Sequence, residues 1–318
     1  MSDSPASDLT WRPITSTDIP AVVTLAAAVD AAESLDFAGG PEFWKWWLDQ
    51  HDLAADVIGV EDASGALAGI AGTFGSDTEA GARSILWFDA HPDHPGLQEP
   101  LLQWAAERGR AQLDAASHPG KVMRLHVEEH RTARRRLVEA HGFTAARTFV
   151  EMERSLTDDL PDERPVPAGV EVVPWTADLD EEARLASNAA FADHWGSLPI
   201  DPEDWTSMVM DEETVRRDLS FVAKSGGDAV ALCLAEVDPE EDPDRVWIQR
   251  VGVRPEWQRQ GLASMLIVRS LRAAAAAGLT STALDVDEES AFDATAIYAG
   301  LGYRVTKRSV AYLLDGPA

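Results

Sequence analysis

The sequence contains only one cysteine, Cys233, among 318 residues. A single cysteine cannot form an internal disulfide, and it argues against a structural zinc site, so we expect no metal. Basic residues are also scarce: 27 Lys and Arg stand against 55 Asp and Glu, which gives a formal net charge of −28. Nucleic-acid phosphates and anionic lipids repel such a chain, so we expect no nucleic-acid partner and no membrane partner.

Long apolar runs are absent too. No stretch reaches the roughly 18 apolar residues that a membrane span needs, and residues 1–10 lack the apolar core of a signal peptide. Combined with the lone cysteine, these absences predict a cytoplasmic protein. The hydrophobic share of 45% and the charged share of 26% are ordinary for globular proteins, which excludes global disorder.

What the sequence does contain is an internal repeat. Residues 157–169 combine prolines and charges with little apolar periodicity, as linkers do, and they separate residues 1–156 from residues 170–318. The same predicted elements recur on both sides: a hairpin (56–74 and 220–237), a strand before a proline (84–90 and 246–253), an amphipathic helix (97–111 and 262–277), a strand (122–127 and 282–286), a helix (132–140 and 291–300) and a last strand (148–154 and 308–314). The sequence therefore predicts two tandem α+β domains. Each is a mixed, mostly antiparallel sheet flanked by helices and completed by its own last strand.

The segment after the strand at 246–253 carries the clearest functional signal. A loop that starts at a proline runs through Gln258, Arg259 and Gly261 into an apolar helix. The N–H groups of such a loop and of the helix N-terminus can bind phosphate oxygens, and the small residues Gly261 and Ala263 permit a close approach. An ordinary strand-to-helix turn has the same composition, so this segment by itself leaves both interpretations open.

Two motifs together resemble a known family. The pattern Gln258-x-x-Gly261-x-Ala263 resembles the pyrophosphate-binding motif of GNAT acyltransferases, (R or Q)-x-x-G-x-(G or A). Residues 289–303, E-S-A-F-D-A-T-A-I-Y-A-G-L-G-Y, are similar to the closing motif of that family. Two motifs in this order are far more specific than either alone. The chain resembles the tandem GNAT acetyltransferases of actinobacteria, a group that includes mycothiol synthase, although only its C-terminal half keeps the motifs.

The resemblance implies acetyl-CoA as the acyl donor, bound in a V-shaped opening between parallel strands at 246–253 and 282–286. Backbone groups of the first strand pair with the pantetheine arm in the family, which implies that role for Val251, Gly252 and Val253. The residues implied to hold the diphosphate are Gln258, Arg259, Gln260, Gly261, Leu262, Ala263 and Ser264.

The closing motif implies two further positions. Tyr298 falls on the family's tyrosine, which protonates the departing CoA thiolate as a general acid; the alternative is an ordinary helix tyrosine that packs beside Leu301. Ser290 stands where the family usually has an asparagine that contacts the cofactor. A serine can still form a hydrogen bond there, or it can cap the helix that follows.

The general base is less clearly marked. An amine must be neutral to attack a thioester, so a carboxylate or a water chain must remove a proton. Many members of the family carry a glutamate on the strand before the pyrophosphate loop, where this chain has Trp247. We expect Glu236 on the neighbouring strand to replace it, with Asp285 and Asp287 as runners-up. A solvated strand end is an equally good interpretation of Glu236.

Acceptor recognition is expected in the loop between the first two helices of the C-terminal half. Asp193, His194 and Trp195 lie next to one another there. A carboxylate, an imidazole and an indole can hold a cationic amine by charge and by cation–π contact. The alternative is a tryptophan that anchors its own loop to the core.

The N-terminal half lacks the corresponding residues. Its loop at 90–97 is shorter and lacks the basic residue that corresponds to Arg259, and Val138 occupies the position that matches Tyr298. His91 and His94 in this loop are interpreted as part of a polar turn rather than as metal ligands. We interpret residues 1–156 as a degenerate GNAT-like domain. The aromatic cluster at 43–47 is predicted to be a helix that packs against the sheet or the other domain.

The predicted function is N-acetyl transfer from acetyl-CoA to the amine of a small acceptor by direct attack in a ternary complex, in a monomer or homodimer. Cys233, the only possible thiol nucleophile, lies in an apolar strand. We expect Arg250, Arg254 and Arg259 to form a positive patch for the anionic cofactor, while the acidic chain favours a cationic acceptor. The alternative function is a non-catalytic acyl-CoA-binding or regulatory protein.

The acceptor itself stays open among small amines, an amino-sugar thiol precursor, an aminoglycoside-like antibiotic and a protein N-terminus. The missing strand carboxylate and the eroded N-terminal motif argue against mycothiol synthase itself.

Overall fold

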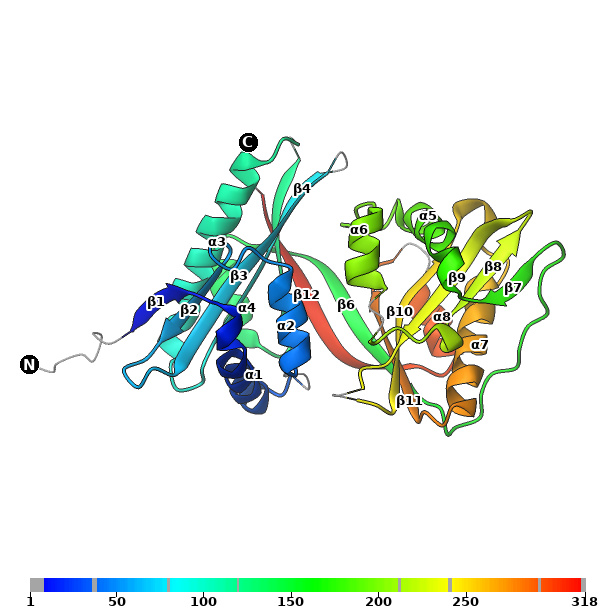
Figure 1. Cartoon of the computed structure of the whole chain (residues 1–318), viewed down its shortest axis with the longest axis horizontal. Coiled ribbons are helices and arrows are strands. Elements are labelled where there is room, and N and C mark those ends of the chain that lie inside the picture. The colour runs from blue at the N-terminus through cyan, green and yellow to red at the C-terminus, as the bar shows by residue number, and fades with distance from the viewer. Residues whose placement is uncertain are drawn as a thin grey trace, which may run out of the picture. The chain divides into compact units, whose positions relative to one another are not determined.

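The computed structural model describes residues 9–35, 39–78, 81–118, 120–210, 213–239, 242–290 and 293–315. The chain divides into two compact units: Met1–Arg147 with Ser309–Ala318, and Thr148–Arg308. Figure 1 shows each unit as a twisted sheet with helices packed against it. Within the described residues, no helix is long and apolar enough to cross a membrane.

The first unit has the strand order β1-β2-β3-β4-β5-β12. Its strands are β1 (Thr10–Pro13), β2 (Val57–Glu61), β3 (Leu67–Thr78), β4 (Gly81–Ala90), β5 (Lys121–Glu128) and the second part of β12 (Arg304–Asp315). Helices α1 (Ile19–Glu33) and α2 (Pro41–Asp49) pack on one face, and α3 (Gln98–Ala115) and α4 (Thr132–Ala140) pack on the other.

The second unit has the strand order β6-β11-β10-β9-β8-β7. Its strands are β6 (Thr144–Ser155), β11 (Ser281–Asp287), β10 (Arg245–Val253), β9 (Asp228–Glu236), β8 (Phe221–Ser225) and β7 (Glu171–Pro174). Helices α7 (Leu262–Ala276) and α8 (Ala294–Gly300) pack on one face. On the other face lie α5 (Asp180–Phe191), the short α6 (Pro202–Asp204) and a π-helical turn, η4 (Trp205–Val209). The α+β class predicted from the sequence is confirmed.

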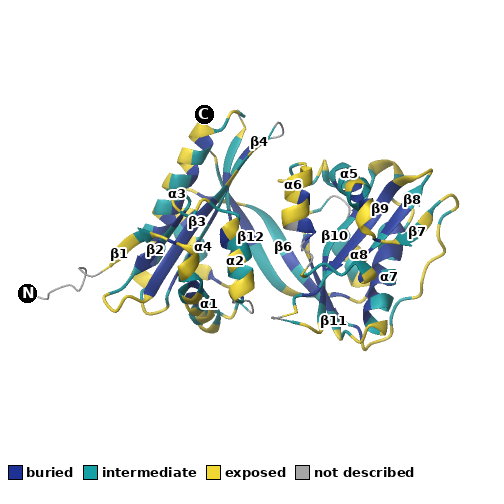
Figure 2. Ribbon diagram, in the orientation of Figure 1, coloured by how far each residue is buried: buried dark blue, intermediate teal, exposed yellow. Residues whose placement is uncertain are grey.

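Strand β9 defines the two faces of the second sheet. Its side chains alternate, as strand geometry requires: Cys233 and Ala235 enter the core beneath α7, whereas Leu232 and Leu234 enter the core beneath α5. The strand is buried on both sides, and the central strands of the sheet are dark blue in Figure 2. We refer to the α5 side as the acceptor face.

The parallel pair β10 and β11 separates after a short contact. Pairing covers only Arg245–Trp247 of β10 against Ser281–Ala283 of β11. Beyond that point β10 stays paired with β9, and β11 stays paired with β6. A β-bulge between Ile248 and Arg250 changes the register of β10 relative to β9 and bends the strand. The result is the V-shaped opening that was predicted.

The last strands of the two repeats are exchanged, so the prediction that each completes its own half is wrong. Residues 149–155 of β6 pair with β11 in the second unit, and residues 309–315 of β12 pair with β5 in the first unit. The end of β12 is fixed in the first unit: Tyr312 is fully buried, and its hydroxyl donates a hydrogen bond to Glu139 of α4 at 2.8 Å. Similar repeats offer each strand two equivalent positions, and an alternating sequence pattern fits both.

The segment at 157–169 contains no helix or strand, as a linker should. The helix predicted at 291–300 is observed as α8 from Ala294, and residues 291–292 lie outside the described residues.

Candidate active site

The loop between β10 and α7 has the backbone conformation of an anion site. Arg259 and Gly261 both have positive φ, 62° and 80°, and Gly261 is the N-cap of α7. No side chain caps this helix, so its first N–H groups, at Leu262, Ala263 and Ser264, have no partner within the helix. Alternating left-handed residues and an uncapped helix start direct several amides to one side, which suits phosphate oxygens.

Two side chains shape this loop. Gln258 donates from Nε2 to the Val253 carbonyl (3.3 Å), which folds the loop back onto the end of β10. Arg259 and Gln260 are exposed. An arginine that is exposed beside uncapped amides can reach a bound anion without any change in the core.

Sequence reasoning missed a second basic residue at the loop, Arg164 of the linker. Its Nη1 lies 3.5 Å from the position that a Cβ on Gly261 would take. The linker is fixed along α7, because Arg272 donates to the Pro161 carbonyl (2.7 Å) and Leu160 packs against the core. The only sequence signal was a positive charge within an acidic linker.

The predicted positive patch is wrong for Arg250 and stays a prediction for Arg254 and Arg259. Arg254 donates from Nε to the Ala229 carbonyl (2.7 Å), which ties the side chain to the start of β9. Arg250 lies on the acceptor face, where its Nη1 donates to Ser187 of α5 (3.2 Å). The bulge in β10 explains the position of Arg250, because it changes the face to which this side chain points.

Tyr298 lies on α8 against the core beneath α7. Its ring makes an edge contact with Tyr303, at 5.9 Å between centroids. Burial of the hydroxyl raises the pKa of Tyr298, and the nearby Cys233 raises it further. Part of the ring remains exposed, and the hydroxyl forms no hydrogen bond with any described residue. The neighbouring Tyr303, in contrast, shares a buried hydrogen bond with Thr282 (3.2 Å).

Cys233 is unsuited to act as a nucleophile. It is fully buried in β9, and burial raises the pKa of its thiol to about 12. A thiol that stays protonated at neutral pH is a poor nucleophile.

Glu236 ends β9 directly opposite Trp247 of β10. It is half-buried, and its Oε2 accepts a hydrogen bond from Gln249 Nε2, at 2.9 Å. Gln249 is the residue at the bulge, and its buried Oε1 has no donor within the described chain. The bulge therefore orients a carboxylate and leaves an amide oxygen available beside it.

Asp285 and Asp287 lie on β11, with side chains that alternate away from the α7 core. Burial raises the pKa of Asp285 to about 6, and the facing Glu151 adds to this rise. Asp285 is exposed on the acceptor face. Asp287 accepts a hydrogen bond from the Glu289 amide (2.9 Å) and faces His194.

The predicted acceptor loop follows α5 directly. The ring of His194 packs against Phe191 at 4.8 Å between centroids, and burial lowers the pKa of His194 despite the opposing effect of Asp287. Trp195 contacts Phe149 of β6 at 6.1 Å. Asp193 is exposed. The imidazole is therefore mainly neutral, and Trp195 does anchor its loop to the sheet.

Ser290 lies in the turn that joins β11 to α8. Its amide donates to the Asp287 carbonyl (3.1 Å), and its own carbonyl accepts from the Asp293 amide (3.1 Å). The N-cap of α8 is Asp293. The alternative role of Ser290 as the helix cap is therefore wrong, while the cofactor contact stays a prediction.

The first unit differs at the matching positions. Val138 of α4 is fully buried in the core, and a short 3-10 turn, Pro95–Leu97, precedes α3. In α2, Trp44 and Trp47 pack against Trp87 of β4 in tilted and edge-on contacts, with ring centroids 6.2 and 6.4 Å apart. The aromatic cluster is thus a packing feature of its own sheet, as predicted.

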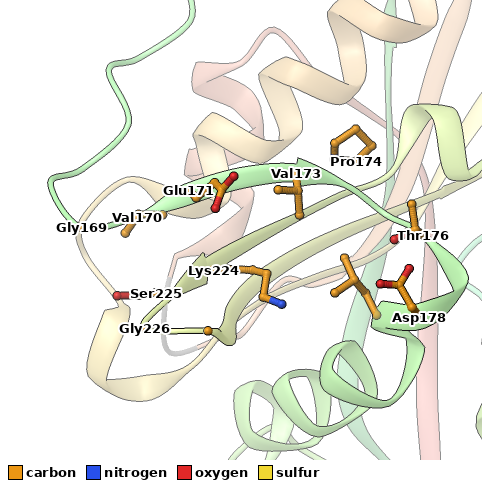
Figure 3. A pocket seen from close by; sticks show the side chains of 12 residues that line it. Gly169, Val170, Glu171, Val173, Pro174, Thr176, Asp178, Lys224, Ser225 and Gly226 are labelled. Atoms are coloured by element: carbon orange, nitrogen blue, oxygen red, sulfur yellow. The ribbon is translucent and has the colours of Figure 1, made fainter.

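A pocket of about 660 Å³ lies at the opposite edge of the second sheet, between β7 and the β8–β9 turn (Figure 3). Its basic lining residue, Lys224, which Figure 3 labels, already forms an ion pair with Glu182 of α5 at 2.8 Å. None of the motif residues lines this pocket. We therefore place the candidate site at the β10–β11 opening and not in this pocket.

Comparison with known proteins agrees with this geometry. Residues 182–303 match the model of the acetyltransferase (GNAT) family. Mycothiol acetyltransferase of Streptomyces bingchenggensis is 30% identical over 310 residues, which cover 94% of this chain and 93% of the relative.

Two solved structures share the fold over nearly the whole chain. A GCN5-related N-acetyltransferase from Sphaerobacter thermophilus has a TM-score of 0.80 at 24% identity and covers 99% of this chain and 98% of its own. A tandem GNAT protein from the clavulanic acid biosynthesis pathway has a TM-score of 0.71 at 15% identity, with coverages of 98% and 100%.

Fold and family together define an acyltransferase that uses an acyl-CoA donor. The chain belongs to the GNAT family of acetyltransferases, whose donor is acetyl-CoA. Family membership favours the enzyme over a non-catalytic acyl-CoA-binding protein.

Proposed function

We propose that the second unit transfers the acetyl group of acetyl-CoA to the amine of a small acceptor by direct attack in a ternary complex. The observation that carries the proposal is Tyr298, whose hydroxyl has no partner within the described residues and lies on the α8 side of the β10–β11 opening. In the proposed complex, the loop at 258–264 holds the diphosphate, with Arg259 and Arg164 as its cations. The backbone of Val251 and Val253 holds the pantetheine arm.

Tyr298 then donates its proton to the sulfur as the carbon–sulfur bond breaks. Desolvation raises the pKa of Tyr298, but it also raises the pKa of any thiol in the same surroundings, as Cys233 shows at about 12. A thiolate that leaves here is therefore basic enough to take the proton. The tyrosinate is reprotonated readily because its pKa is raised.

The proton of the attacking amine goes to Glu236 in this proposal. Gln249 orients that carboxylate on the acceptor face, and its unpaired Oε1 can accept an N–H from the amine. Asp285 is the second candidate base. Most of the rate enhancement comes from holding the amine beside the thioester, with proton transfer contributing about 10²–10⁴-fold.

The first unit is proposed to hold no donor and to carry out no chemistry. The reason is that a buried valine stands at the position of the acid, and the loop before α3 has no counterpart of Arg259.

Thiol release from acetyl-CoA by the full-length protein, with a panel of small amines, tests this function. Because the relative from S. bingchenggensis is named for mycothiol, amines that precede low-molecular-weight thiols belong in the panel. We expect amine-dependent release, with one N-acetylated product per CoA, that survives Cys233→Ala. Acetyl-CoA binding without turnover on any amine would overturn the proposal.

A further inference from the structure

Arg250 lies on the acceptor face without an acidic partner. Its Nη1 donates to Ser187, and its guanidinium carbon lies 5.2 Å from the ring centroid of Phe191 and 5.9 Å from that of Trp205. Its Nε is enclosed and has no acceptor, and no carboxylate of the described residues forms an ion pair with it. One edge of the guanidinium therefore has no hydrogen-bond partner.

This arrangement is costly for the protein alone. Burial of a cation without a counter-charge is unfavourable, and it lowers the pKa of Arg250. One hydroxyl and two aromatic faces offset only part of that cost. Two other arginines of the same unit form ion pairs: Arg217 with Asp180 at 2.8 Å, and Arg245 with Asp242 at 3.1 Å. The chain has 55 acidic residues, so the missing counter-charge of Arg250 is not due to a shortage of carboxylates.

A second donor in the same cluster also lacks an acceptor. Trp205 is 2% exposed, and its indole Nε1 has no hydrogen-bond partner among the described residues. Buried donors in native proteins are normally satisfied, so two unsatisfied donors in one cluster point to an acceptor that comes from a ligand.

We propose that Arg250, supported by Trp205, binds a carboxylate of the acyl acceptor, so that the acceptor is an amino acid or another amine that carries a carboxylate. This inference rests on the proposed function of the second unit. Arg250 directly precedes Val251, and its side chain points to the acceptor face. The acceptor's carboxylate would therefore bind close to the reacting thioester.

The surrounding charges favour a carboxylate over a phosphate. Glu236, Asp285 and Asp287 lie on the same face, so one guanidinium balances a monoanion, whereas a dianion would be repelled. The planar fork of arginine also matches a carboxylate in a bidentate geometry. The acidic side chains suit the ammonium end, and together the groups select a zwitterion.

Matched acceptor pairs test the proposal in the full-length protein. Each pair is an amino acid and its carboxamide, such as glycine and glycinamide, and kcat/KM is measured by thiol release. We expect the acid to be preferred at least tenfold, although the amide has the more readily deprotonated amine. Arg250→Gln should reduce that ratio to about one by raising KM for the acid, and Arg250→Lys should keep part of it.

Arg245→Gln is the control, because it removes the same charge from the first residue of the same strand, where Asp242 and Glu151 already neutralise it. It should leave the ratio unchanged. Turnover that shows no preference, or a preference for carboxamides, would overturn the carboxylate proposal and leave the proposed function standing. A ratio that survives Arg250→Gln would also overturn it.

Calorimetric binding of the same pairs to the CoA-loaded protein separates the two proposals. If no amine turns over, the proposed function fails. Arg250 is then judged by binding alone: acid affinity that falls at least tenfold in Arg250→Gln supports the carboxylate site, and unchanged affinity refutes it. The wild-type acid-to-amide ratio needs no variant, so the test does not depend on whether Arg250→Gln folds.

Discussion

Tyr298 and Tyr303 are five positions apart on one helix and its turn, and their rings touch, yet their hydroxyls differ. Tyr303 is 2% exposed and bonds Thr282. Tyr298 is partly exposed and bonds none of the described residues. A satisfied buried hydroxyl stabilises the fold, whereas an unsatisfied one at an opening is available to a substrate.

Tyr298→Phe is therefore expected to lower kcat by about 10²-fold or more, as loss of a general acid does. The Kd for CoA should change less than twofold, because the hydroxyl acts mainly as the bond breaks. Steady-state kinetics and calorimetry measure the two effects. Tyr303→Phe is the control: it should cost about 1–3 kcal/mol of unfolding free energy with kcat nearly unchanged. Unchanged kcat in Tyr298→Phe would remove the assigned role.

Asp285 gives the protein a pH dependence of stability with an unusual sign. Burial and the facing Glu151 raise the pKa of Asp285 from an ordinary value of 3.8 to about 6. The folded state therefore holds the proton more tightly than the unfolded state, so this residue favours folding below pH 4 and loses that contribution as pH rises through 6. Solvent contact of the side chain reduces the size of the effect.

Asp285→Asn should accordingly raise the melting temperature at pH 7.5 and leave it nearly unchanged at pH 4. Thermal unfolding at the two pH values measures this difference. Asp158→Asn, in the exposed linker, should have no such pH-dependent effect. A variant that is equally stabilised at both pH values would show that the charge of Asp285 is not the cause.

At the scale of elements, the start of α7 depends on a left-handed residue. Gly261 has φ of 80°, and a Cβ there would have only Arg164 within 4 Å. The constraint at this position is therefore conformational rather than steric. A side chain would strain the loop by about 1–2 kcal/mol and place a methyl group where phosphate oxygens approach.

Gly261→Ala is expected to weaken CoA binding by about tenfold, which corresponds to about 1.4 kcal/mol, with little change in the fold. The matching glycine of the first unit, Gly96, provides the control, since its Cβ would meet nothing within 4 Å. Gly96→Ala should leave the Kd for CoA unchanged. Equal loss in both variants would mean that the first unit also binds the cofactor.

The sequence predicted the strands and helices of both repeats because their apolar alternation and turn residues are local signals. It also predicted the loop at 258–264, because the small residues Gly261 and Ala263 are a local signal too. It did not predict which face of the sheet carries the Arg250 side chain. Counting from Val246 and Ile248, which face the α7 core, strict alternation places residue 250 in the same core. The bulge at Gln249 moves Val251 to that face instead and turns Arg250 to the acceptor face.

The sequence also did not predict the position of Arg164 or the exchange of the last strands, for a different reason. Both depend on contacts between segments far apart in the chain: the linker against the start of α7, and β6 against β11. A local sequence pattern does not determine which of two similar sheet positions a strand occupies.

At the scale of the whole molecule, the exchange of last strands makes each unit depend on both repeats. The second unit needs residues 149–155 of β6 to cover β11, and the first unit needs residues 309–315 of β12 to cover β5. A division of the chain at the linker would therefore leave an edge of each sheet uncovered.

We predict that a fragment of residues 148–308, which holds all six strands of the second unit, folds and binds CoA. A fragment of residues 157–318 lacks β6 and should be unstable or aggregate. Circular dichroism, thermal unfolding and CoA titration of the two fragments measure this difference. Equal stability of both would show that the exchanged strand adds little to the second sheet.

In the mechanism that we propose, the second unit alone holds the donor. The stoichiometry of acetyl-CoA binding to the full-length chain, measured by calorimetry, tests it most directly. We expect one molecule per chain, with binding lost when Gly261 is replaced by Val. Two molecules per chain, or one that still binds after Gly261→Val, would contradict it.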